Sequence, residues 1–177
     1  MASGIPNNIE GRWYLNGTEI TSTAAQLNTA GTAAVAGTST NDNATAGNIG
    51  QYISSSVLIG SAVSLTSSVA ANVTSISLTA GDWDVSGVVL YNPNAATTTS
   101  YMQVGISQTS ATQPTLGAEN NGVFSTDTLA AGVAEAFTIG PMRISLAGTT
   151  TVYLVAEATF AVNTQSAYGF IGARRVR

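Results

Sequence analysis

Hydrophobic residues recur at every second position through most of the chain after residue 48, whereas the apolar face of a helix would repeat every three to four residues. Strict alternation is typical of β-strands that bury one face. The clearest alternating faces are formed by Trp83, Val85 and Val89, by Met102, Val104 and Ile106, and by Val152, Leu154, Ala156, Ala158 and Phe160. The pattern therefore predicts an all-β domain.

Short clusters of turn-forming residues, such as Asn92-Pro93-Asn94, separate the apolar runs. We expect strands near residues 50–57, 61–66, 73–79, 82–92, 99–108, 122–126, 134–139, 142–147, 150–160 and 168–176, with two of them merging. Regularly spaced strands of this kind are typical of sandwiches and barrels. Their number and length favour an eight-stranded antiparallel jelly-roll sandwich.

The alternation changes parity once within a single apolar stretch. Phe137 and Ile139 have one parity, whereas the apolar residues Met142 and Ile144 have the other. The change falls at Gly140-Pro141, and both residue types are typical of a bulge, a bend or a strand break. We expect one of these irregularities there.

Residues 1–48 have a different pattern from the rest of the chain. Asn16-Gly17 is a hairpin turn signal between Arg12–Leu15 and Thr18–Ile20. A capping box beginning at Thr23 predicts a short helix near residues 24–29. The following stretch to residue 48 is rich in Ala, Thr, Gly and Asn, as in a linker or extended arm. We therefore expect an N-terminal arm at 1–48 and a jelly-roll domain at 49–177.

The arm contains few large apolar residues, and Trp13 and Tyr14 are the largest of them. So small a segment cannot bury two aromatic rings by itself. Two interpretations remain open: the rings fold back onto the core of the chain, or they dock onto another subunit or another protein.

Composition excludes many chemistries. Only 8% of residues are charged, against a usual value of about 25%, and the chain has no Cys, His or Lys. Disulfides, thiolate nucleophiles, imidazole bases and Schiff-base lysines are therefore absent. A net charge of −4 argues against nucleic-acid binding, and no apolar run approaches the length of a membrane span. The N-terminus has no signal-peptide pattern, so we expect synthesis in a cytoplasm.

Two groups of charged residues are candidate sites. Asp82 and Asp84 lie two apart on a predicted strand and share a face, as the paired acids of a glycan hydrolase or a metal site would, although solvated acids are ordinary beside a turn. Arg174, Arg175 and Arg177 form either a solvated terminus or ion pairs across a subunit interface. We favour the solvated interpretation for the acids and expect no metal.

Five segments resemble proteins of tailed-bacteriophage virions. Residues 78–87 (LTAGDWDVSG), 147–156 (AGTTTVYLVA) and 168–175 (YGFIGARR) are similar to segments of phage structural proteins with a trimeric jelly roll like the tumour-necrosis-factor fold. Residues 13–17 (WYLNG) and 20–28 (ITSTAAQLN) are similar to the N-terminal attachment segment of head decoration or head-fibre proteins.

The resemblance implies a capsid decoration protein that binds the major capsid protein as a homotrimer on the outer surface of the phage head. It implies no enzyme activity, no cofactor, and no nucleic-acid or membrane partner. Partner binding is expected from Trp13, Tyr14, Leu15, Ile20 and Leu27, and a trimer interface from Arg174, Arg175 and Arg177.

An alternative is a tail-fibre or receptor-binding tip that recognises a host glycan or protein. Its candidate sugar-binding loops are residues 91–94 and 119–122, which carry Tyr and Asn side chains. Binding to host cells rather than to capsids would distinguish this function from decoration.

Overall fold

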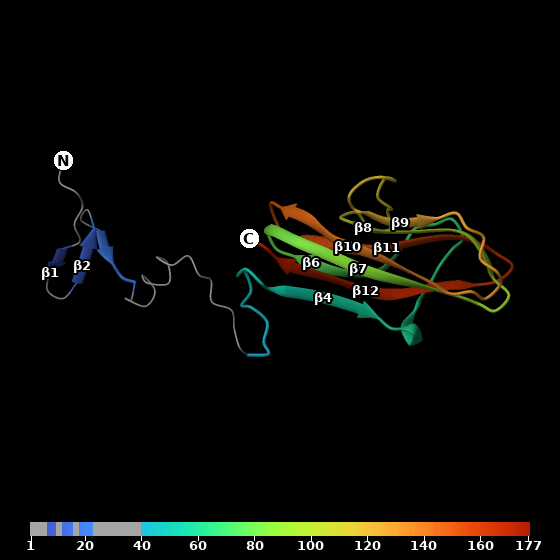
Figure 1. Ribbon diagram of the computed structural model, residues 1–177, viewed down its shortest axis with the longest axis horizontal. Coiled ribbons are helices and arrows are strands. Elements are labelled where there is room, and N and C mark those ends of the chain that lie inside the picture. Colours follow the sequence, from blue (N-terminus) through green and yellow to red (C-terminus); the bar gives the residue numbers. More distant parts are fainter. Residues whose placement is uncertain (1–6, 10–11, 16–17, 23–39) are drawn as a thin grey trace. The chain divides into compact units, whose positions relative to one another are not determined.

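The computed structural model describes residues 7–9, 12–15, 18–22 and 40–177 (Figure 1). The chain divides into two compact units, Met1–Asp42 and Asn43–Arg177. This division lies six residues before the boundary expected from composition, because Asn43 already belongs to the larger unit. The Asn43 side chain donates to Tyr52 O and accepts from Tyr52 N, at 2.7 Å in each case.

The smaller unit contains a three-stranded antiparallel sheet. Its strands β1 (Asn7–Ile9), β2 (Arg12–Leu15) and β3 (Thr18–Ile20) pair in that order. The strand limits of β2 and β3 agree with the hairpin predicted from Asn16-Gly17, whereas β1 was not anticipated. The predicted helix at 24–29 lies outside the described residues.

The larger unit is an eight-stranded antiparallel sandwich with a two-residue strand and one short 3₁₀ turn. Its elements are β4 (Tyr52–Val57), η1 (Ile59–Ser61), β5 (Val63–Ser64), β6 (Ala71–Leu78), β7 (Gly81–Pro93), β8 (Thr98–Ser107), β9 (Asn121–Ser125), β10 (Glu135–Leu146), β11 (Thr150–Ala161) and β12 (Gln165–Arg175). One sheet has the order β10-β7-β12-β4, with β5 also paired to β12, and the other has the order β6-β11-β8-β9.

This strand order is that of a jelly roll. Strands β4, β6, β7 and β8 alternate between the two sheets, β9 stays beside β8, and β10, β11 and β12 alternate again. Each sheet therefore contains strands that are distant in sequence, as two interleaved Greek keys require. The jelly-roll prediction is confirmed, and the sheet order is new information (Figure 1).

The core lies between the two sheets and is formed by the alternating faces predicted from the sequence. Trp83, Val85 and Val89 are fully buried, as are Val104 and Leu154. Because strands alternate, the intervening residues point away from the core on the outer face of each sheet.

The parity change in β10 is a register irregularity between Ile139 and Met142. The two predicted strands at 134–139 and 142–147 are thus one continuous strand with a bulge. The bulge allows Ile139 and Met142, despite their opposite parity, to face the same core.

The loops of the larger unit gather at two opposite ends of the sandwich. Antiparallel pairing places 43–51, 79–80, 147–149 and the residues after β12 at one end, which we call the proximal end. The opposite, distal end carries the loops 58–70, 94–97, 126–134 and 162–164.

Candidate functional site

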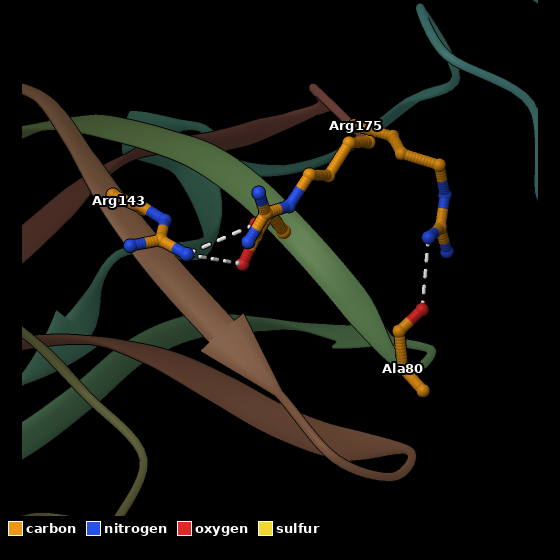
Figure 2. A network of polar contacts seen from close by, with 5 residues as sticks. Ala80, Arg143 and Arg175 are labelled. Atoms are coloured by element: carbon orange, nitrogen blue, oxygen red, sulfur yellow. Dashed lines mark hydrogen bonds and ion pairs between the residues drawn. The ribbon is translucent and has the colours of Figure 1, made fainter.

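A polar cluster closes the proximal end of the jelly roll. Asp82 begins β7 with 3% of its surface exposed, and Arg143 Nη2 on β10 lies 3.0 Å from each of its carboxylate oxygens (Figure 2). Arg177 pairs with the same carboxylate. Hydrogen bonds from Ser145 and Arg143 hold the pKa of Asp82 below its usual value. The buried acid is therefore an ionised structural group.

Arg175 has a second set of partners at the same end. Only 5% of the residue is exposed, and its guanidinium carbon lies 4.3 Å from the ring centroid of Trp83. One Nη donates to Ala80 O at 2.8 Å (Figure 2). The other Nη donates to the Thr79 hydroxyl, and Nε donates to Gln51 Oε1 at 3.2 Å. Arg175 thus joins the chain terminus to the β6–β7 turn and to the start of β4.

These contacts argue against a glycan hydrolase that uses Asp82 and Asp84 as its paired acids. Asp82 and Asp84 share the outer face of β7 as expected, but Asp82 is buried rather than solvated, and only Asp84 is exposed. A glycosidase needs one carboxyl with a raised pKa to act as its acid, whereas the Asp82 pKa is lowered. Among the described residues, no group of three or more possible metal-binding side chains occurs.

The sequence did not reveal the partnership between Asp82 and Arg143. The two residues are 61 positions apart and meet only because β10 pairs with β7. The available signal was Arg143 itself, a lone cation in an alternating strand whose neighbours are uncharged. Pairing it with an acid requires the strand order.

The three C-terminal arginines have different environments. Arg174 is exposed on the outer face of β12, Arg175 is buried among partners of its own chain, and Arg177 is largely exposed beside Asp82. Their predicted role in a trimer interface stays a prediction. Of the three, Arg174 is the one that projects from a sheet face.

The outer face of the five-stranded sheet carries an apolar and aromatic cluster. Val88 and Leu90 on β7 lie opposite Phe170 and Tyr168 on β12, and all four are half-buried. Tyr52 on β4 lies opposite Arg174 on the same face and is 41% exposed. We call Tyr52, Val88, Leu90, Tyr168 and Phe170 the aromatic face.

Two rings of the aromatic face meet over a glycine. A Cβ placed on Gly172 would overlap Tyr52 Oη and would lie 2.8 Å from Phe170 Cζ. The absence of a side chain at Gly172 therefore leaves room for both rings over β12. This arrangement presents broad ring surface, which is typical of protein interfaces.

The outer face of the four-stranded sheet is covered by the chain itself. Residues 108–120, which we call the cover loop, cross the face over Gly105, where a Cβ would overlap Pro114. Gln103 Nε2 donates to Pro114 O at 3.1 Å, and Gln113 Nε2 donates to Gln103 O at 2.9 Å. Beside them Val155, which lies outside the central core cluster, is fully buried.

The cover loop is also held at its sides. Asn72 Nδ2 on β6 donates to Ser110 Oγ, and Asn72 Oδ1 accepts from Ala111 N, at 2.7 Å in each case. Asn120 Nδ2 donates to Ile106 O at 3.0 Å. The 119–122 loop proposed for sugar binding thus contains one residue that supports the cover loop.

The other proposed sugar-binding loop is divided between core and surface. Tyr91 is 1% exposed, and its hydroxyl lies 2.7 Å from Gln103 O and 3.0 Å from Glu157 O. Burial raises the pKa of Tyr91. Tyr91 is therefore unavailable to a ligand, and its predicted role is wrong. Asn92 and Asn94, in contrast, line a cavity of about 320 Å³ at the distal end.

The predicted partner-binding residues of the smaller unit lie on its sheet. Trp13 is opposite Asn8 and Ile20 in the strand register, and half-buried Tyr14 is opposite Glu19. Leu15 is on β2 as well. Leu27 lies outside the described residues, so the anchor assignment stays a prediction.

No protein-family model and no curated protein match the chain. Among solved structures, it is similar to "Structure of infectious bursal disease virus Gx strain" with a TM-score of 0.43 and 11% identity, over 81% of this chain and 36% of that chain. It is also similar to "Structure of infectious bursal disease virus Gt strain" with a TM-score of 0.37 and 12% identity, over 74% and 30%. A third similar structure is "Crystal structure of infectious bursal disease virus VP2 subviral particle", with a TM-score of 0.35 and 12% identity, over 71% and 30%.

This chain thus spans about a third of the length of the chains that it matches. The jelly-roll assignment rests on the strand order and pairing described above. Within the described residues, no helix has both the length and the apolar character needed to cross a bilayer.

Proposed function

We propose that this protein is a structural component of a tailed-bacteriophage virion that decorates and stabilises the capsid. In this function it binds the major capsid protein as a homotrimer on the outside of the head and has no enzymatic role. The observation that carries the proposal is the aromatic face, a cluster of ring and aliphatic surface on one sheet of a complete jelly roll. The resemblance of five sequence segments to phage virion proteins supports the same function.

The trimer interface includes the aromatic face. Phe170 and Tyr168 are half-buried in one chain, and burying their remaining surface between subunits is favourable by about 25 cal/mol per Å². Arg174 borders the same face, so the arginine predicted at a subunit interface adjoins the ring cluster. Its guanidinium suits a carboxylate of the neighbouring subunit.

The smaller unit attaches the trimer to the capsid. A sheet of three short strands buries little surface of its own, so its aromatic residues are suited to contact with a larger partner. Trp13 and Tyr14 on β2 are the proposed anchors, with Leu15, Ile20 and Leu27 around them. Three such units in one trimer bind jointly, which raises the overall affinity above that of a single unit.

The capsid is stabilised by mass action. A protein that binds the assembled shell and not its separate subunits shifts the equilibrium toward the shell. The polar cluster at the proximal end fixes the first residues of the larger unit. Arg175 near the end of the chain forms hydrogen bonds with Gln51, which precedes β4.

Co-sedimentation with expanded, undecorated capsids tests the attachment. The full-length protein is expected to sediment with capsids at a fixed stoichiometry, and the Trp13→Ala/Tyr14→Ala variant is expected to stay in the supernatant. Thr18→Ala, an exposed change on neighbouring β3, is the matched control and should bind like the original protein. Full occupancy by the double variant would refute the anchor assignment, provided that its circular dichroism matches that of the original.

The same preparation tests the alternative function. A tail-fibre or receptor-binding tip would sediment with host cells and not with capsids. That result would overturn decoration and would make the smaller unit a tail attachment.

A further inference from the structure

The distal end contains a cavity that the capsid-binding function does not use. Its volume is about 320 Å³, near the lower end of the range of roughly 300–1,000 Å³ found for small-molecule sites. Three segments line it: the turn and short strand after β4, the end of β7, and the start of β12. The lining residues are Ile59, Gly60, Ala62, Ser64, Asn92, Pro93, Asn94, Thr164, Gln165 and Ser166.

The lining contains no charged side chain, and several of its polar groups are unused. Gln165 is 2% exposed, and its Oε1 accepts from Thr99 Oγ1 at 3.0 Å. Asn94 Oδ1 accepts from Ala96 N at 3.2 Å. In the described part of the chain, no hydrogen bond is formed by Gln165 Nε2, by Asn94 Nδ2 or by the amide of Asn92. Asn92 and Asn94 are exposed, so their amide nitrogens are available to a ligand that supplies oxygen atoms.

The lining is mostly polar and includes a small apolar part. Ile59, which is 59% exposed, and Pro93 at the end of β7 are its largest apolar residues. The lining thus combines an apolar surface with amide donors and acceptors. A sugar ring has the complementary chemistry, because it carries C–H faces and a rim of hydroxyl groups. An anionic ligand has no counter-charge in this lining.

The cavity lies at one end of the larger unit. It lies at the distal end, whereas the connection to the smaller unit is at the proximal end. Asn92 and Ser166 belong to the outer-facing positions of their strands, beyond the aromatic face. The cavity therefore borders the aromatic face on the same sheet.

We propose that the distal cavity binds a neutral mono- or disaccharide through the amides of Asn92, Asn94 and Gln165. The site gives the protein a carbohydrate-binding function in addition to capsid decoration. It does not depend on decoration, since the isolated protein contains every lining residue.

Saturation-transfer NMR on the full-length protein tests the site directly. The probes are glucose, galactose, mannose, N-acetylglucosamine and their β-linked disaccharides, with glucuronic acid and sialic acid as charged counterparts. We expect saturation transfer to at least one neutral sugar. In ¹⁵N spectra the same sugar should shift the signals of Asn92, Asn94 and the Gln165 side-chain amide.

A matched pair of glycine variants separates this site from other binding. Gly60 lines the cavity, and a Cβ there meets no atom within 4 Å, so Gly60→Leu adds bulk at the cavity without a backbone clash. Gly148 has equally open surroundings at the proximal end, which makes Gly148→Leu the control. Gly60→Leu should weaken binding at least tenfold, and Gly148→Leu should leave it unchanged. Asn92→Ala should weaken binding three- to tenfold.

Three results would overturn the proposal. The first is the lack of saturation transfer to every neutral sugar, and the second is undiminished binding by Gly60→Leu. The third is tighter binding of the charged sugars than of the neutral ones. None of these results affects capsid co-sedimentation, so failure of this site is distinguishable from failure of the decoration function.

Discussion

The two outer faces of the jelly roll differ in what covers them. On the four-stranded sheet, the cover loop places Pro114 in the space left by Gly105 and forms hydrogen bonds with Gln103 and Asn72. On the five-stranded sheet, Tyr168 and Phe170 stay half-exposed, and Tyr52 is 41% exposed. The cover loop thus packs on the outer face of the four-stranded sheet, whereas the outer face of the five-stranded sheet exposes aromatic rings.

The difference shows how a chain with few charges divides its apolar surface. A sheet face can be completed within the monomer by a loop of about a dozen residues, at the cost of ordering that loop. Apolar surface that is exposed in the monomer can instead be buried when subunits associate, and its burial then stabilises the oligomer. We therefore assign subunit contact to the aromatic face and monomer stability to the covered face, and each assignment can be tested separately.

The largest expected effect is the loss of the trimer on charging the aromatic face. Phe170→Glu places a carboxylate at the centre of the cluster, where burial between subunits would leave it without a partner. Sedimentation velocity should show a trimer for the original protein and a monomer for the variant. Thr151→Glu adds the same charge on an exposed position of β11 and should remain trimeric.

Two observations would contradict this assignment. A monomeric original protein would remove the trimer, and a trimeric Phe170→Glu variant would move the interface elsewhere. Circular dichroism of the variant distinguishes dissociation from unfolding, because the half-buried position of Phe170 lies outside the core cluster.

A smaller effect is expected from disturbing the covered face. In Gly105→Val the new side chain overlaps Pro114, so the cover loop must move or the sheet must distort. Overpacking of this kind lowers the free energy of unfolding by about 1–3 kcal/mol, measurable by urea denaturation. The oligomeric state should not change.

Two further variants check the cause of that loss. Gly140→Val has open surroundings and should have little effect, whereas Pro114→Gly should restore part of the stability in the Gly105→Val background. Additive losses in the double variant would contradict a contact between the two residues.

The sequence contained most of the fold but not its pairings. Alternation at Trp83, Val85 and Val89 located both the strand and its buried face, since side-chain direction depends only on neighbouring positions. The parity change at Gly140-Pro141 likewise located the bulge in β10. Such local signals do not depend on which strands become neighbours.

The candidate sites depended on contacts between distant residues. Tyr91 was expected in a binding loop, yet its hydroxyl reaches Glu157 O in the other sheet. The cover loop contacts β8 through Gln103 and Gln113, and no periodicity in residues 108–120 indicates that contact. Sequence reasoning could name these residues but not their surroundings, because strand order decides which of them meet.

The smallest effect concerns Asp82, at the proximal end of the outer face of the five-stranded sheet. Here Arg143 and Arg177 lie over the buried carboxylate. The pKa of Asp82 is lowered in the folded protein, so its contribution to stability is present above the ordinary aspartate pKa near 3.8 and is lost as the pH falls through the lowered value.

Asp82→Asn removes this contribution. The midpoint of thermal unfolding should therefore be lower for the variant at pH 7, and the two proteins should converge in acid once the pH is below the lowered pKa of Asp82. Asp84→Asn changes the net charge equally on the same strand, but it removes an exposed carboxylate and should follow the original protein throughout. Parallel curves for Asp82→Asn and the original protein would show that the arginines cover this end of the face without depending on the charge of Asp82.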